Sequence, residues 1–217
     1  LSKGESPRDT ILNLAALAPD ALVVRCSDDL DLAGLSQEIS VPIINAGWGQ
    51  KGHPTQALLD LMTVQQAFQG KVKNKKWLFI GDIVHSRVAS SHFELLNQFG
   101  IEIGVLAPPD WIPSGFKNLK IFTSRDQALA WCDVAYALRV QFERHKKDQV
   151  TLKPEDYFHH YALTAESVKN LNVIIMHPGP INRGVEITSE VADDPRAIIL
   201  DQVENGVAVR MAVVSFS

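Results

Sequence analysis

His53 and Gln56 stand three residues apart in the segment Gly52–Leu61, which reads G-H-P-T-Q-A-L-L-D-L. Pro54 suits the first position of a helix, because its fixed φ is helical and no hydrogen bond is lost there. The two side chains would then share one face of the helix start. The positive end of the helix disfavours an imidazolium, so we expect a neutral His53 that can polarise a carbonyl oxygen. The alternative is a histidine that only caps the helix.

The segment Gly81–Ser91, G-D-I-V-H-S-R-V-A-S-S, resembles a strand that leaves through Gly-Asp into a helix. It lacks the G-x-G-x-x-G pattern of a dinucleotide site, which argues against a nicotinamide-dependent oxidoreductase. Arg87 lies near the predicted helix start, where the helix dipole and a guanidinium together favour an anion. We expect His85 to be a solvated loop residue.

A third segment, Arg139–Arg144, reads R-V-Q-F-E-R directly after a predicted strand. Alternation places Arg139, Gln141 and Glu143 on one side. A guanidinium can bind a carboxylate through two parallel hydrogen bonds, which a lysine cannot do. The alternative is a solvated, charged loop.

The fourth segment, His177–Ile187, begins H-P-G-P. Its prolines keep the backbone extended, so its carbonyl groups cannot fold back into a helix. Such a loop could offer carbonyl acceptors to a ligand that carries N–H groups. A rigid turn without a ligand is the alternative.

Strands that alternate with helices must position these segments. The apolar, β-rich runs are 21–25, 41–45, 77–81, 102–106, 119–123, 133–138, 173–177 and 197–201. The helical patterns cover 8–18, 55–68, 86–100, 125–131, 164–170 and 205–214. This alternation predicts an α/β fold with parallel sheets, whose ligands bind beyond the carboxyl ends of the strands. Between the predicted strand 133–138 and Tyr157 the pattern indicates a long charged loop (138–157), typical of a lid or binding loop.

Composition excludes several classes of protein. The chain has 217 residues, a net charge of −4 and 46% apolar residues, which is typical of a globular protein and unlike a nucleic-acid binder. No apolar run reaches the roughly 18–20 residues of a membrane span, and Leu1–Glu5 is no export signal. Cys26 and Cys132 have no metal-ligand spacing, so we expect buried, reduced thiols and a cytoplasmic location.

Together, and in this order, the four segments resemble the catalytic chain of aspartate carbamoyltransferases. Further matches are K-G-E-S-x-x-D-T at Lys3–Thr10, the strand end Val23–Arg25 and G-V-A-V-R-M-A at Gly206–Ala212. Ornithine carbamoyltransferases carry H-C-L-P where this chain has H-P-G-P. The resemblance covers essentially the whole chain.

The resemblance implies an enzyme that transfers the carbamoyl group of carbamoyl phosphate to L-aspartate in pyrimidine biosynthesis, with neither cofactor nor metal. The implied ligands of carbamoyl phosphate are Arg25, His53, Gln56, Gly179 and Pro180. The implied ligands of aspartate are Lys3, Arg87, Arg139 and Gln141. His53, Arg25 and Lys3 would be the catalytic residues.

The implied fold has two doubly wound, parallel-sheet domains, the first of them incomplete. Residues 1–69 would form part of the carbamoyl-phosphate domain with its connector helix, and 70–205 the aspartate domain, with the basic stretch Gly70–Lys76 at the seam. Residues 206–217 would begin a helix that returns to the first domain. The implied assembly is a homotrimer in which Lys3 reaches a neighbour's site. It could join regulatory chains or other pyrimidine-pathway enzymes, but neither nucleic acid nor membrane.

The S-x-R-T-R phosphate loop of the family is expected upstream of Leu1. We therefore expect a fragment, an incomplete record or a shortened relative, and little turnover by these 217 residues alone. The alternative function is a non-catalytic relative that serves in assembly or partner binding.

Overall fold

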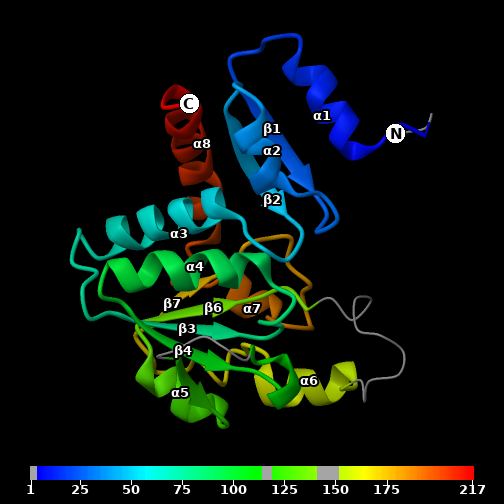
Figure 1. Ribbon diagram of the computed structural model, residues 1–217. Coiled ribbons are helices and arrows are strands. Elements are labelled where there is room, and N and C mark those ends of the chain that lie inside the picture. Colours follow the sequence, from blue (N-terminus) through cyan, green and yellow to red (C-terminus); the bar gives the residue numbers. More distant parts are fainter. Residues whose placement is uncertain (1–3, 114–118, 141–151) are drawn as a thin grey trace.

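The computed structural model describes residues 4–113, 119–140 and 152–217, which form two parallel β-sheets with helices packed on them (Figure 1). The smaller sheet pairs β1 (Leu22–Cys26) with β2 (Ile43–Trp48). The larger has the order β5-β4-β3-β6-β7. Its strands are β3 (Lys76–Ile80), β4 (Glu102–Leu106), β5 (Leu119–Phe122), β6 (Val134–Ala137) and β7 (Ile174–Met176). All neighbours in both sheets are parallel, as the sequence predicts.

Both faces of the larger sheet are covered, which makes it doubly wound. Trp77 and Phe79 of β3 point to the face that α3 (Pro54–Ala67) and α4 (Arg87–Gln98) cover. Leu78 and Ile80 point to the opposite face, against α5 (Arg125–Trp131). Strand residues therefore alternate between two apolar cores rather than between core and solvent, which explains why the strands are almost continuously apolar.

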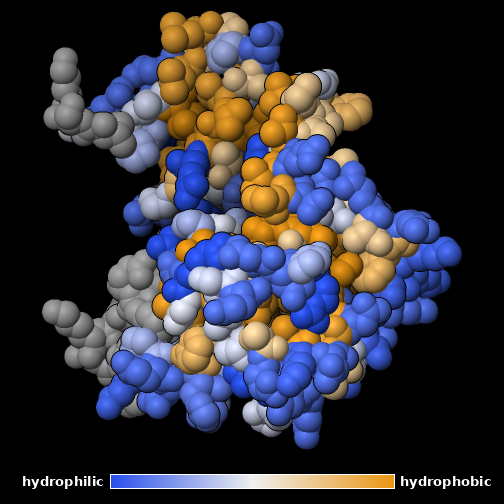
Figure 2. Space-filling model, turned by 180° about the vertical axis from the view of Figure 1, so that it is seen from behind, coloured by the Kyte–Doolittle hydropathy of each residue, from blue (hydrophilic) through white to orange (hydrophobic). Residues whose placement is uncertain are grey.

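The smaller sheet is covered by α1 (Pro7–Ala15) and α2 (Leu32–Glu38). Val23 of β1 points away from these helices and is 64% exposed. Figure 2 shows apolar side chains gathered over the part of the molecule that holds β1, β2 and α8 (Ile199–Ser215). Val207, Met211 and Val214 of α8 are exposed there.

Three sequence predictions differ from the structure. Residues 197–201 are not a strand: Ala197 makes one bridge to Ile175, and α8 starts at Ile199. The predicted helix 164–170 is a series of turns, closed by reciprocal bonds between Thr164 and Ser167. Part of the predicted long loop is the helix α6 (Pro154–Tyr161).

The remaining short elements are η1 (Pro109–Trp111) and α7 (Ser189–Ala192). Cys132 is buried as expected, and burial raises the pKa of its thiol to about 12, whereas Cys26 is only half-buried. No helix in the described part of the chain is both long and apolar enough to cross a membrane.

Candidate active site

A cavity of about 250 Å³ opens where the smaller sheet faces the larger one. It is lined by Arg25, His53, Gln56, His85, Ser86, Arg87, Val88, Leu138, Arg139, Pro178, Gly179 and Pro180. Every site residue that the sequence predicts within the described part of the chain lies in this lining. Lys3 and Gln141 lie outside the described residues, as does most of the stretch 138–157.

Sheet topology explains why residues so distant in sequence meet. Arg25 lies at the end of β1, and the other residues come from the loops after β2, β3, β6 and β7 or from the first turns of the helices α3 and α4 that follow β2 and β3. In the larger sheet β3 and β6 are neighbours. After β3 the chain continues to β4 on one side, and after β6 it continues to β7 on the other side. Ligands of open α/β sheets bind at such a switch point, beyond the carboxyl ends of the strands. Arg87 and Arg139 follow the two strands that flank it.

Arg87 is placed by a helix start and by a glycine. Ser86 caps α4, its hydroxyl accepting from the N–H of Ala89, so Arg87 is the first helical residue. Gly47 of β2 has a φ of +125°, and a Cβ there would lie 3.2 Å from the Arg87 guanidinium carbon. The missing side chain at Gly47 is thus what lets the guanidinium lie close to the β2 backbone.

His53 is held by its backbone rather than by capping through its ring. Its N–H donates to Ser91 Oγ of α4 at 2.8 Å, and its side chain makes no capping hydrogen bond to α3. His53 therefore occupies the N-cap position of α3, as predicted, but its side chain does not do the capping that the alternative requires. The ring Nδ1 lies 3.4 Å from the hydroxyl of Thr55.

The environment keeps His53 neutral, as predicted, but for a different main reason. Burial, and after it the charges of Arg87, Arg210 and Arg25, together lower the pKa of His53 to about 4. A folded-state pKa below the usual value means that His53 is uncharged from about pH 4 upward. The ring can therefore donate a hydrogen bond at neutral pH without carrying a charge.

Arg139 lines the cavity and carries a buried polar atom without a partner among the described residues. It follows β6, and its Nε is buried with no hydrogen-bond acceptor among the described residues. A buried donor without an acceptor destabilises the free protein, and a bound carboxylate would satisfy it. The solvated-loop alternative for Arg139 does not fit this burial.

The loop after β7 is fixed by a buried histidine–glutamate pair. His177 Nε2 lies 3.0 Å from Glu186 Oε1, and His177 Nδ1 accepts from the N–H of Gly179 at 2.9 Å. Gly179 has a φ of +67°, a conformation that favours glycine. Pro178, Gly179 and Pro180 are thereby held in the cavity wall.

Sequence reasoning misplaced or missed several residues. His85 is not a solvated loop residue: it lines the cavity, and its Nδ1 lies 2.8 Å from Oδ1 of the buried Asp82. Arg210 was missed; it lines two adjoining cavities and lowers the pKa of His53. Arg210 is the arginine of the segment G-V-A-V-R-M-A. The sequence alone does not show that this arginine lies near His53, because that depends on the packing of α8 against α3.

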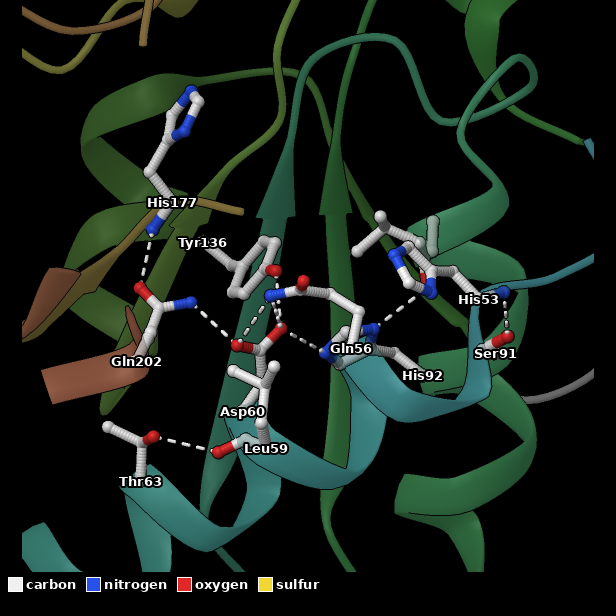
Figure 3. Close-up of polar contacts among 12 residues, drawn as sticks. His53, Gln56, Leu59, Asp60, Thr63, Ser91, His92, Tyr136, His177 and Gln202 are labelled. Carbon is white, nitrogen blue, oxygen red and sulfur yellow. Dashed lines mark hydrogen bonds and ion pairs between the residues drawn. The ribbon is translucent and has the colours of Figure 1, made fainter. Parts of the chain in front are cut away.

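A buried cluster behind the cavity was also missed. Figure 3 shows the Asp60 carboxylate of α3 surrounded by side chains from α3, α4, β6 and α8. Asp60 and Gln56 are four residues apart, which is the spacing of neighbours on a helix face. That spacing was visible in the sequence, but the other partners were not.

The cavity is suited to anions. A chain with a net charge of −4 gathers Arg25, Arg87 and Arg139 around one small volume, together with a neutral histidine. Guanidinium groups bind carboxylates and phosphates through paired hydrogen bonds. The described residues contain no cluster of three or more side chains that could hold a metal ion.

Comparison with protein families matches two models to the chain. Residues 1–66 match the carbamoyl-P binding domain of aspartate/ornithine carbamoyltransferase, and residues 73–217 match the Asp/Orn binding domain. Among curated proteins, the aspartate carbamoyltransferase catalytic subunit of Helicobacter hepaticus is 45% identical over 218 residues, covering 99% of this chain and 72% of the relative. That of Agrobacterium fabrum is 46% identical, covering 98% and 69%.

Solved structures agree with the sequence comparison. The catalytic subunit of M. jannaschii aspartate transcarbamoylase superposes with a TM-score of 0.81 at 33% identity, covering 98% of this chain and 70% of that one. Aspartate transcarbamoylase from Trypanosoma cruzi, in complex with carbamoyl phosphate, gives 0.83 at 28% identity, covering 98% and 71%. The same enzyme has been solved with aspartate and phosphate.

Proposed function

The chain belongs to the aspartate/ornithine carbamoyltransferase family, and on that premise we propose that it transfers the carbamoyl group of carbamoyl phosphate to the amine of L-aspartate. The products are N-carbamoyl-L-aspartate and phosphate, in pyrimidine biosynthesis. The observation that carries the proposal is the cavity in which Arg25, Arg87 and Arg139 surround a neutral His53. Both substrates are anions, and three guanidinium groups can match their charge.

Carbamoyl phosphate would lie between the two sheets. Arg25 comes from the end of β1, His53 from the start of α3, Gln56 from α3 itself, and the backbone of Gly179 and Pro180 from the loop after β7. We assign the phosphate to Arg25 and the carbonyl oxygen to His53. Since the Nδ1 of His53 lies beside the Thr55 hydroxyl, it can accept from that group, which leaves the ring proton on Nε2 for the carbonyl oxygen.

Aspartate would lie nearer the larger sheet. Arg87 and Arg139 flank the switch point between β3 and β6, and each can bind one carboxylate in a two-point contact. Gln141 follows Arg139 closely in the chain and is assigned to the same substrate. This arrangement directs the aspartate amine toward the carbamoyl carbon.

The reaction then requires no protein nucleophile. The neutral amine forms an N–C bond to the carbamoyl carbon, and the carbonyl oxygen becomes a tetrahedral oxyanion facing His53. The C–O bond to phosphate breaks, and the departing phosphate can accept the amine proton. Orientation and donors aimed at the oxyanion supply most of the rate.

A product assay tests the proposal. The purified full-length product of the parent gene is supplied with carbamoyl phosphate and either L-aspartate or L-ornithine, and the products are identified by mass spectrometry. We expect carbamoyl-aspartate with an equal amount of phosphate, and no citrulline, because ornithine lacks the second carboxylate. Citrulline formation would reassign the second substrate. No transfer to either amine would favour the alternative of a non-catalytic relative, which the cationic cavity argues against.

Replacing Gly47 with alanine is expected to weaken aspartate binding specifically. The new Cβ would lie 3.2 Å from the Arg87 guanidinium, closer than ordinary contact, and would displace it. We expect KM for aspartate to rise by roughly tenfold, the equivalent of one weakened charged hydrogen bond. Gly70→Ala is the matched control: Gly70 also has a positive φ, but its Cβ would meet nothing within 4 Å. An equal effect of both variants on KM would show a general loss of stability.

We further propose that residues 1–69 and 70–205 act as carbamoyl-phosphate and aspartate domains, that 206–217 belong to a helix that returns toward the first domain, and that the protein forms homotrimers with shared sites. In such trimers Lys3 would bind aspartate in a neighbour's cavity. Inactive Lys3→Ala and His53→Ala chains, when mixed and reassembled, should then regain part of the activity. A mixed trimer can form a site in which both residues are intact. No recovery after demonstrated subunit exchange would contradict sharing.

A further inference from the structure

The side chain of Asp60 is completely buried behind the cavity and accepts hydrogen bonds from several elements (Figure 3). Its Oδ1 accepts from Gln56 Nε2 at 3.1 Å and from Gln202 Nε2 at 2.6 Å. Its Oδ2 accepts from the hydroxyl of Tyr136 at 2.5 Å, and His92 Nε2 lies 3.0 Å from it. Asp60 thus joins α3, α4, β6 and α8 at one point.

Both oxygens of Asp60 act as hydrogen-bond acceptors, for Gln202 Nε2 and for the hydroxyl of Tyr136, and this decides how Gln56 is oriented. The amide of Gln56 must turn its NH₂ toward Asp60, because its oxygen would be repelled there. Asp60 therefore binds the Nε2 of Gln56 and leaves its Oε1 available to another partner. Gln56 is also one of the residues that line the cavity. The cavity wall therefore receives an acceptor at this position rather than a donor.

The same reasoning extends through Gln202 to the loop after β7. Gln202 gives its NH₂ to Asp60, so its Oε1 is free to accept from the backbone N–H of His177 at 3.0 Å. His177 in turn accepts from the N–H of Gly179. A single carboxylate thus fixes both the amide of Gln56 and the start of the loop whose backbone lines the cavity.

We propose that Asp60 is a positioning residue that selects carbamoyl phosphate, by turning hydrogen-bond acceptors toward the amino group of the carbamoyl moiety. This inference rests on the proposed function. Acyl phosphates with a methyl group in place of the NH₂ leave these acceptors unpaired. A site built to hydrogen-bond an N–H rejects the analogue that lacks it, by up to roughly 10⁴-fold.

Acetyl phosphate is the matching probe, since it differs from carbamoyl phosphate only by CH₃ for NH₂. The measured quantity is the ratio of its inhibition constant to the KM of carbamoyl phosphate. In Asp60→Asn, residue 60 offers one donor and one acceptor, so Gln56 is no longer forced into one orientation. We expect the ratio to fall by at least about tenfold, mainly through a higher KM for carbamoyl phosphate. KM for aspartate should change by less than about threefold, because Arg87 and Arg139 do not contact Asp60.

Tyr136→Phe is the control, because it removes a donor to Asp60 without changing the charge or freeing Gln56. Its ratio should match that of the wild type within about twofold. If Asp60→Asn does not fold, Gln202→Met tests the hydrogen bonds that connect Asp60 through Gln202 to the backbone of His177. This variant should also lower the ratio. The proposal would be overturned if the ratio stayed the same in Asp60→Asn, either because neither constant changed or because the inhibition constant of acetyl phosphate and the KM of carbamoyl phosphate rose together. Absence of carbamoyl-aspartate from the wild-type reaction would instead overturn the proposed function.

Discussion

Replacing His53 with alanine is expected to lower kcat by about 10²–10³-fold, the usual effect of losing one oxyanion donor. The carbonyl oxygen of carbamoyl phosphate gains charge only as the amine attacks, so the donor matters more in the transition state than in the bound substrate. KM for carbamoyl phosphate should change only modestly. Steady-state kinetics with both substrates varied will separate the two constants.

Two measurements make this prediction specific. His53→Gln keeps an N–H donor at the position and should recover part of the lost turnover. In the wild type, the pKa of about 4 means that protonation of His53 should add no acid limb to the turnover profile near pH 6.5, where an ordinary histidine would gain a proton. Unchanged kcat in His53→Ala would remove this residue from the mechanism. An acid limb near pH 6.5 that disappears in His53→Gln would contradict a neutral His53.

Arg139→Ala is expected to lower kcat/KM for aspartate by roughly 10²-fold or more, since truncating one partner of a buried charged pair typically costs about 2–5 kcal/mol. The buried Nε of Arg139 lacks an acceptor among the described residues, and the bound carboxylate would supply one. Carbamoyl phosphate binding should change by less than about threefold, because its phosphate is assigned to Arg25. Isothermal titration with each substrate will measure the two affinities separately.

Arg139→Lys keeps the charge but not the two-point contact, so it should recover little of the lost activity. Arg183→Ala is the control for removing an arginine: Arg183 is exposed, pairs with Asp193 and lies outside the cavity. It should leave kcat/KM unchanged. If Arg139→Ala weakened both substrates equally, Arg139 would have to be a structural residue.

The strands of the larger sheet could be predicted because each is a short apolar run bounded by polar turns. The run 102–106 coincides with β4, and 125–131 coincides with α5. The segments that hold His53, Arg87 and Arg139 followed from the same reasoning, because polar residues just after parallel strands meet at one edge, whereas Arg25 was predicted only through the family resemblance. The run A-I-I-L at 197–200 shows the limit of this signal. Leu200 is 81% exposed, so its apolar character reflects neither a strand nor the core.

Other features depend on contacts between distant segments. α6 has a proline at its start, acidic residues in its first turn and histidines in its last, which are helix signals that the charged surroundings obscured. Asp60 is different: its partners Tyr136 and Gln202 lie 76 and 142 residues away in the chain. Only the packing of α3 against β6 and α8 shows that its carboxylate is buried and satisfied.

Most residues that line the cavity are attached to the larger sheet and its helices, and few to the smaller sheet. His53 begins α3, which packs along α4 and α8, and its backbone is bonded to Ser91 of α4. Among the described lining residues, Arg25 is the one that sits on a strand of the smaller sheet. If the two sheets rotated about each other, His53 would travel with Arg87 and Arg139, and Arg25 would move against them. Such a rotation would change the contacts of the phosphate, which is assigned to Arg25, and leave those of the amino acid substrate unchanged.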